Sequence, residues 1–140
     1  MERIFAKNWF GVIARVVLTF MFWASGLAKS IDFSAGMAEM THFGLEPAAF
    51  FNVATIVVQL GGSALIILNF HAWAGALALA VFTAATIPIA HTFWTMEEPI
   101  RTIEFYVVVE HISIIGALLV VAWATSRKDR STPAPAQAGI

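Results

Sequence analysis

Residues 48–68 read AAFFNVATIVVQLGGSALIIL and contain no charged side chain. The hydrocarbon layer of a bilayer is about 30 Å thick, so a helix needs roughly 20 mostly apolar residues to cross it. This stretch therefore predicts a transmembrane helix. Three further apolar stretches, residues 10–28, 72–91 and 105–124, predict three more spans.

The composition of the whole chain supports a membrane protein. Of its 140 residues, 59% are hydrophobic and 12% are charged, whereas soluble domains average about 45–50% and about 25%. The net charge of −1 makes nucleic acid an unexpected partner. The chain has no cysteine, which excludes disulfides, thiolate zinc sites and cysteine-ligated iron–sulfur clusters.

The four predicted spans with their short connections predict an all-α, integral membrane four-helix bundle. Lys and Arg concentrate on the cytoplasmic side of membrane proteins. Five of them flank the termini and two lie in the other loops, so we expect both termini in the cytoplasm. Residues 1–125 should form one transmembrane domain, and the charged, then Pro/Ala-rich residues 126–140 a disordered cytoplasmic tail. Arg15 interrupts the first apolar run, which argues against a cleaved signal peptide.

Polar side chains within the spans recur at helical spacing. Polar groups in hydrocarbon are costly unless they face protein or water, so these residues should mark the inward face of each helix. The predicted intramembrane polar seam consists of Arg15, Thr19, Asn52, Thr55, Gln59 and Ser113.

Several ionisable and aromatic residues fall near the outer ends of three spans. We predict a binding pocket there, formed by Lys29, His91, Trp94, Glu110 and Trp23, with Lys29 paired to Glu110. Plainer alternatives remain: Lys29 snorkelling to the interface, a purely structural ion pair, and His91 as a helix-end residue. His111 directly follows Glu110 and is expected on the lipid side, and Gln59 beside Gly61 and Gly62 suits simple helix packing.

No complete catalytic constellation and no metal-binding spacing is present in the sequence. A haem held by His91 and His111 is a remote alternative. The catalytic residues are therefore unknown at this stage, and no cofactor is certain.

The order of several motifs resembles the DoxX family of small bacterial membrane proteins. The motifs are Ser25-Gly26-Leu27-Ala28-Lys29, Ile31-Asp32-Phe33, Phe43-Gly44-Leu45-Glu46-Pro47, Val58-Gln59-Leu60-Gly61-Gly62, Phe82-Thr83-Ala84-Ala85-Thr86, His91-Thr92-Phe93-Trp94, and the run that starts at Glu110-His111. The resemblance covers residues 10–124. It implies a four-helix protein of the bacterial inner membrane, and some relatives are subunits of quinone-linked oxidoreductases.

Two departures from the family pattern affect the expected chemistry. The membrane-embedded Glu of the family is Gln59 here, and the Asn of its last helix is replaced by Glu110-His111. A proton-linked role of the usual Glu would therefore have to move to Glu110.

Three functions are compatible with the sequence. The first is a non-catalytic membrane component or assembly partner of a larger, possibly redox, complex. The second is a quinone-linked oxidoreductase subunit whose head-group pocket lies near the outer leaflet. The third is a small-solute or ion pathway. The expected partners are the lipid bilayer, a membrane or periplasmic redox protein, and further copies of the chain.

Overall fold

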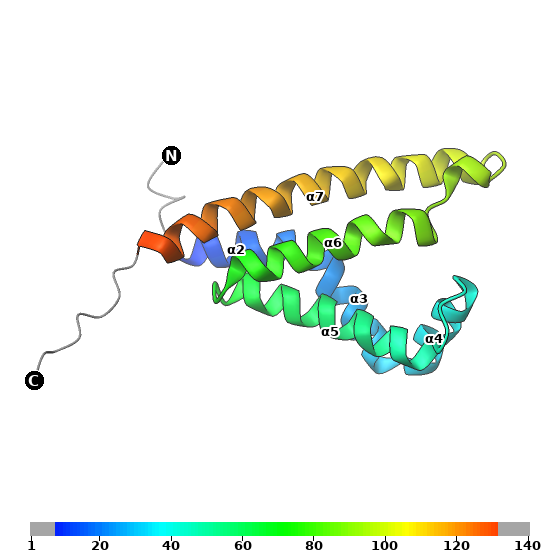
Figure 1. The fold of residues 1–140 in the computed structure, drawn as a ribbon, viewed down its shortest axis with the longest axis horizontal. Helices are drawn as coiled ribbons and strands as arrows, with labels where there is room; N and C mark the ends of the chain where they lie inside the picture. The colour runs from blue at the N-terminus through cyan, green and yellow to red at the C-terminus, as the bar shows by residue number, and fades with distance from the viewer. Residues whose placement is uncertain (1–7, 132–140) are drawn as a thin grey trace, which may run out of the picture.

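The computed structural model describes residues 8–131, and this part of the chain is helical with short connections (Figure 1). The predicted all-α class is confirmed. In chain order the elements are α2 (Asn8–Leu18), α3 (Phe20–Ile31), α4 (Phe33–His42), α5 (Ala48–Ile67), α6 (Ala72–Ala90), the 3₁₀ turn η1 (Phe93–Thr95) and α7 (Ile100–Ser131).

Three helical segments in the described residues are long and apolar enough to cross a membrane: Ala48–Ile67, Ala72–Thr95 and Ile100–Arg127. A fourth span exists if α2 and α3, which are bent by 59° at their junction, are counted together. The second and third predicted spans agree with α5 and α6 to within a residue. The first predicted span, which the sequence presents as continuous, is broken.

The break lies at Thr19, which is fully buried. Its hydroxyl donates to the Arg15 carbonyl at 2.8 Å. The Val16 carbonyl, which would bond the Phe20 N–H in an unbroken helix, accepts a hydrogen bond from the Trp23 indole Nε1 at 3.1 Å. The indole therefore gives the Val16 carbonyl a partner at the bend, while the Arg15 carbonyl also accepts from the Thr19 N–H at 3.1 Å.

The core lies between α3, α5, α6 and α7, and it contains Phe22, Ile66, Ala76, Leu79, Ala80 and Leu118. Two glycines let α5 and α6 approach closely. A Cβ on Gly62 would lie 2.7 Å from Leu79 Cγ, and a Cβ on Gly75 would lie 2.7 Å from the Gly62 carbonyl oxygen. Small residues commonly serve this purpose between membrane helices.

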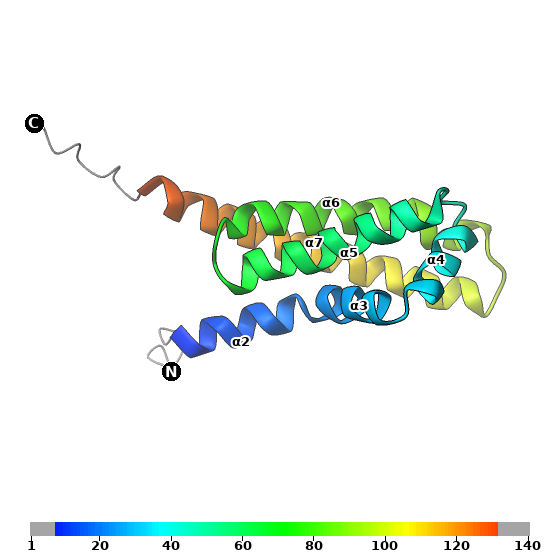
Figure 2. The same ribbon diagram turned by 90° about the horizontal axis from the view of Figure 1, so that it is seen from below.

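The two described ends of the chain lie at the same end of the molecule, together with the α5–α6 turn (Figures 1 and 2). Helix α4 and η1 lie at the opposite end, which is called the α4 end below. Helix α7 continues to Ser131. The predicted disorder from Ser126 is therefore wrong for residues 126–131, and residues 132–140 lie outside the described residues.

Candidate functional site

A cavity of about 470 Å³ lies between α3, α4, α5, α6 and α7. We call it the central pocket. Its walls are mainly apolar and include Met21, Phe22, Met40, Phe43, Phe51, Val58, Phe82 and Ile89. Its polar lining consists of Ser25, Lys29, Glu39, Thr55, Gln59, Thr83, Thr86, His91 and His111. An apolar chamber with a few polar groups is the usual form of a small-molecule site.

An ion pair between α3 and α4 lies on one side of the pocket. Lys29 Nζ is 2.7 Å from Glu39 Oε2, and the lysine side chain is 12% exposed against 45% for the glutamate. The predicted pairing of Lys29 with Glu110 is therefore wrong. Lysine reaches the nearer carboxylate, which α4 brings back over the end of α3, whereas Glu110 is exposed on α7.

Two contacts fix α4 in this position. Asp32 caps its first turn by accepting from the Ala35 N–H at 2.9 Å, and the Ser34 hydroxyl donates to the same oxygen at 2.8 Å. These bonds to Ala35 and Ser34 lower the pKa of the Asp32 carboxyl below its usual value. The buried Asn52 carboxamide lies against Gly36 and donates to the Phe33 carbonyl at 3.3 Å.

Gln59 and Thr83 are the buried polar residues of the pocket lining. Gln59 comes from the middle of α5, the residue is 6% exposed, and its Oε1 has no hydrogen-bond partner among the described residues. Thr83 and Thr86, which line the pocket with it, donate to the backbone of their own helix. A buried polar atom without a partner costs about 1–3 kcal/mol, and Gln59 Oε1 is such an atom in the pocket lining.

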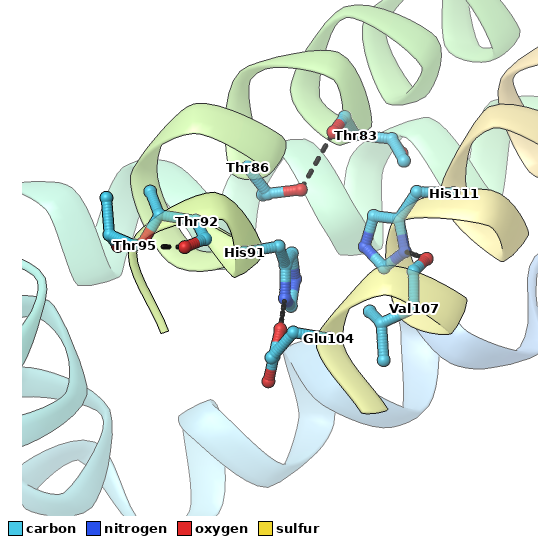
Figure 3. A network of polar contacts seen from close by, with 8 residues as sticks. All are labelled: Thr83, Thr86, His91, Thr92, Thr95, Glu104, Val107 and His111. Atoms are coloured by element: carbon cyan, nitrogen blue, oxygen red, sulfur yellow. Dashed lines mark hydrogen bonds and ion pairs between the residues drawn. The ribbon is translucent and has the colours of Figure 1, made fainter. Parts of the chain in front are cut away.

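Two histidines meet at the side of the pocket formed by α6 and α7 (Figure 3). Their ring centroids are 4.7 Å apart in a T-shaped contact. His91, the C-cap of α6, lies with Nδ1 2.7 Å from Glu104 Oε2. His111 lies with Nδ1 2.8 Å from the Val107 carbonyl oxygen on its own helix.

These contacts determine which ring nitrogens are free. A carbonyl oxygen only accepts, so His111 Nδ1 must carry the hydrogen that it shares with Val107. When Glu104 is ionised, His91 Nδ1 carries the hydrogen of its contact in the same way. In their neutral forms, both rings therefore keep a lone pair on Nε2.

The other predicted pocket residues lie elsewhere. Trp23 bonds the backbone at the α2–α3 break, Trp94 is exposed on η1 and contacts Phe93, and Glu110 is exposed on α7. None of the three is among the residues that line the central pocket. The sequence thus placed two of its five candidates, Lys29 and His91, in the cavity that the structure contains.

The predicted polar seam divides in a similar way. Thr55 and Gln59 line the pocket, whereas Thr19 and Asn52 are buried at the bend and beneath α4. Arg15 is half-buried, and its Nε has no hydrogen-bond partner among the described residues. Ser113 is exposed and donates to the Val109 carbonyl, so its predicted inward position is wrong.

Three site residues were missed by the sequence analysis. His111 was expected on the lipid side but lines the pocket. Glu39 and Glu104 were not among the predicted site residues. Glu104 and His91 lie on either side of the α6–α7 connection, and two antiparallel helices place such residues opposite each other. That spacing is the signal in the sequence from which the pair could have been found.

The site offers no strong metal centre. Within residues 8–127, no group of three or more His, Cys, Asp or Glu side chains is arranged to hold a metal ion. A haem between His91 and His111 does not fit either, because two axial imidazoles must lie on opposite faces of the porphyrin. Rings in T-shaped contact at 4.7 Å leave no room for it.

The apolar helices and the central pocket define a small multi-pass membrane protein. The DoxX family profile matches residues 11–92, more than half of the chain, and the protein belongs to the DoxX family. The resemblance predicted from the sequence is confirmed over these residues. No curated protein and no solved structure gave a match.

The match ends at Thr92, so it contains α3 to α6 and most of α2 but none of α7. Lys29, Glu39, Gln59 and His91 lie within it. Glu104 and His111, which complete the α6–α7 side of the site, lie beyond it.

Proposed function

We propose that this protein is a bacterial inner-membrane subunit that binds a quinone head group in the central pocket and works with a separate redox partner. The observation that carries the proposal is Gln59, a buried amide with an unpartnered Oε1 in a largely apolar cavity. Such a cavity suits a ring and an isoprenoid tail, which are apolar apart from the ring oxygens.

The amide chemistry of Gln59 suits both redox states of this ligand class. A carboxamide has one acceptor and two donors, so it can donate to a quinone carbonyl or accept from a quinol hydroxyl. It also remains neutral, and a neutral group favours a neutral ligand in a low-dielectric pocket. Thr55 and Thr86 add hydroxyl oxygens along the same lining.

Binding of decylubiquinone to the protein in nanodiscs tests this proposal. We expect decylubiquinone to quench the tryptophan fluorescence of the wild-type protein saturably. Gln59→Leu, which has a similar volume but no hydrogen-bonding group, should weaken binding by roughly tenfold, the effect of about 1.4 kcal/mol. Ser113→Ala, on the exposed face of α7, should leave the affinity unchanged. Absence of saturable quenching, or equal affinities for wild type and Gln59→Leu, would overturn the proposal.

The membrane orientation is part of the proposal. Both termini should lie in the cytoplasm and the α4 end toward the periplasm. The distribution of Lys and Arg supports this orientation, as do the two described chain ends at one end of the molecule (Figures 1 and 2). Green fluorescent protein fused to either terminus should fluoresce, since it folds in the cytoplasm. A dark C-terminal fusion that is expressed at full length would contradict the orientation.

A second candidate function, a component of a larger membrane complex, is favoured by Glu110. This carboxylate is exposed on α7, about 15 Å along the helix from Ile100 at 1.5 Å per residue. A charged side chain facing acyl chains costs about 3 kcal/mol, and contact with another protein would remove this cost. We therefore expect native mass spectrometry to detect a larger species that Glu110→Leu weakens. A monomer in both samples would rule this function out.

A further inference from the structure

The Gln59 amide can hydrogen-bond a ligand but cannot take up a proton at neutral pH. A ligand of the quinol class, however, gains and loses protons at its ring oxygens. A group with an accessible lone pair must therefore serve the pocket. In the described lining, His91 and His111 offer such a group at Nε2.

We propose that His91 and Glu104 form a proton-transfer pair that connects the central pocket with water at the α4 end, an inference that rests on the proposed function. His91 lines the pocket, and its Nδ1 lies 2.7 Å from Glu104 Oε2. Glu104 is not part of the pocket lining, and its side chain is 23% exposed against 22% for His91. The His91 ring thus lies between the pocket and the Glu104 carboxylate, and Figure 3 shows the contact between the two side chains.

The step involves protons only. His91 Nε2 accepts the proton of a ligand hydroxyl, so an O–H bond breaks and an Nε2–H bond forms. The Nδ1 proton of the imidazolium passes to Glu104 Oε2, which leaves a neutral ring with its hydrogen on Nε2. Glu104 then releases that proton to water and becomes a carboxylate again. The reverse sequence delivers one proton to the ligand oxygen.

Hydrogen bonding orients His91 as the proton carrier. Glu104 Oε2 lies at hydrogen-bond distance from His91 Nδ1, as a carboxylate orients an imidazole in hydrolase active sites. His111, from the same helix as Glu104, contacts the His91 ring and is oriented by its bond to Val107, with Glu110 beside it in the chain. Lys29 and Glu39, the charged groups of α3 and α4 at the pocket, are paired with each other.

Proton exchange at His91 tests the pair directly. In ligand-free nanodiscs with ¹⁵N-histidine-labelled protein, we expect the His91 Nδ1 proton to exchange with water at least about tenfold faster in wild type than in Glu104→Gln. A positioned general acid–base group typically accelerates proton transfer by about 10²–10⁴-fold, so tenfold is a lower bound. Glutamine still accepts the Nδ1–H hydrogen bond, so the ring should stay in place. The control is Glu97→Gln, an exposed acid in the connection that precedes α7, and a His91→Asn sample assigns the signal.

Decylubiquinone binding to the same samples separates this inference from the proposed function. Slower exchange in Glu104→Gln together with binding supports both proposals. Slower exchange without any binding supports the proton pair but overturns the quinone assignment. Equal exchange rates in Glu104→Gln and wild type overturn the proton pair, whether or not decylubiquinone binds.

Discussion

The two ends of the molecule are built in opposite ways. Near the end with the α5–α6 turn, Gly62 and Gly75 bring two helix backbones into contact, and apolar side chains fill the remaining space. At the α4 end, the same helices enclose the central pocket, in which the buried Gln59 Oε1 has no hydrogen-bond partner among the described residues. The close-packed end therefore fixes the helices relative to one another, and the α4 end keeps a cavity with a buried amide that is costly for stability but suited to a ligand.

The largest expected effect concerns the close-packed end. Gly75→Ala should lower the free energy of unfolding by about 2 kcal/mol, since the added Cβ would meet the Gly62 carbonyl oxygen and Leu65 Cβ at 2.7 and 2.8 Å. Gly61→Ala is the matched control, because a Cβ there meets nothing within 4 Å. It should be neutral or stabilising by about 1 kcal/mol, as alanine favours helix. Thermal unfolding in detergent measures the stability of both variants. Equal effects of Gly75→Ala and Gly61→Ala would contradict the close packing of α5 and α6 at Gly75.

Gln59→Leu should stabilise the ligand-free protein, whereas Gly75→Ala should destabilise it. Removing a buried oxygen without a partner should raise the free energy of unfolding of the ligand-free protein by about 1 kcal/mol. The same substitution weakens ligand binding, so stability and binding should change in opposite directions. A clear loss of stability in Gln59→Leu would mean that the amide is a structural group and not one reserved for a ligand.

A more local effect is expected for Gly36→Ala. The added Cβ would overlap the Asn52 carboxamide, which must then move away from α4. We expect faster hydrogen exchange in residues 33–42, by roughly tenfold for about 1.4 kcal/mol of local destabilisation, with little change in α6. Exchange that rises equally in all helices would show that α4 is not a separately anchored element.

The smallest effect is the pH dependence of the α4 cap. The pKa of Asp32 is lower in the folded protein than its ordinary value of 3.8. The ionised carboxylate therefore stabilises the fold fully at pH values above 3.8, and this stabilisation is lost as the pH falls through the lowered pKa of the folded protein. Hydrogen exchange at the start of α4 should therefore accelerate at the acid end of a titration in wild type, and Asp32→Asn should remove this dependence. An unchanged acid response in Asp32→Asn would contradict the assignment.

The long apolar helices could be predicted because the length and hydrophobicity of a stretch are enough to indicate a membrane-spanning helix. The uncharged stretches at 48–68 and 72–91 agree with α5 and α6. The break at Thr19 could not be predicted, since no Pro or Gly marks it and the hydrogen bonds that stabilise it involve side chains in their folded positions. The end of α7 was misjudged because a helix can continue into a charged segment beyond the apolar run.

The candidate site was predicted only in part, for a related physical reason. Helical spacing identified Gln59 and Thr55 as inward-facing, and both line the pocket. Helical spacing cannot decide which of two adjacent residues on α7 faces inward. In the structure His111 lines the pocket and Glu110 is exposed. The partners of Lys29 and His91 depend on how α4 and the α6–α7 connection fold back over the helix ends. The spacing of residues within one helix gives no information on this folding.

Photoaffinity labelling tests the central claim most directly. A membrane-embedded azidoquinone should label peptides of α5 and α6 that line the central pocket, and excess decylubiquinone should prevent this labelling. Gln59→Leu should reduce the competed fraction. Competed labelling confined to the exposed face of α7 around Glu110, or labelling that excess decylubiquinone does not reduce, would contradict a quinone site in the central pocket.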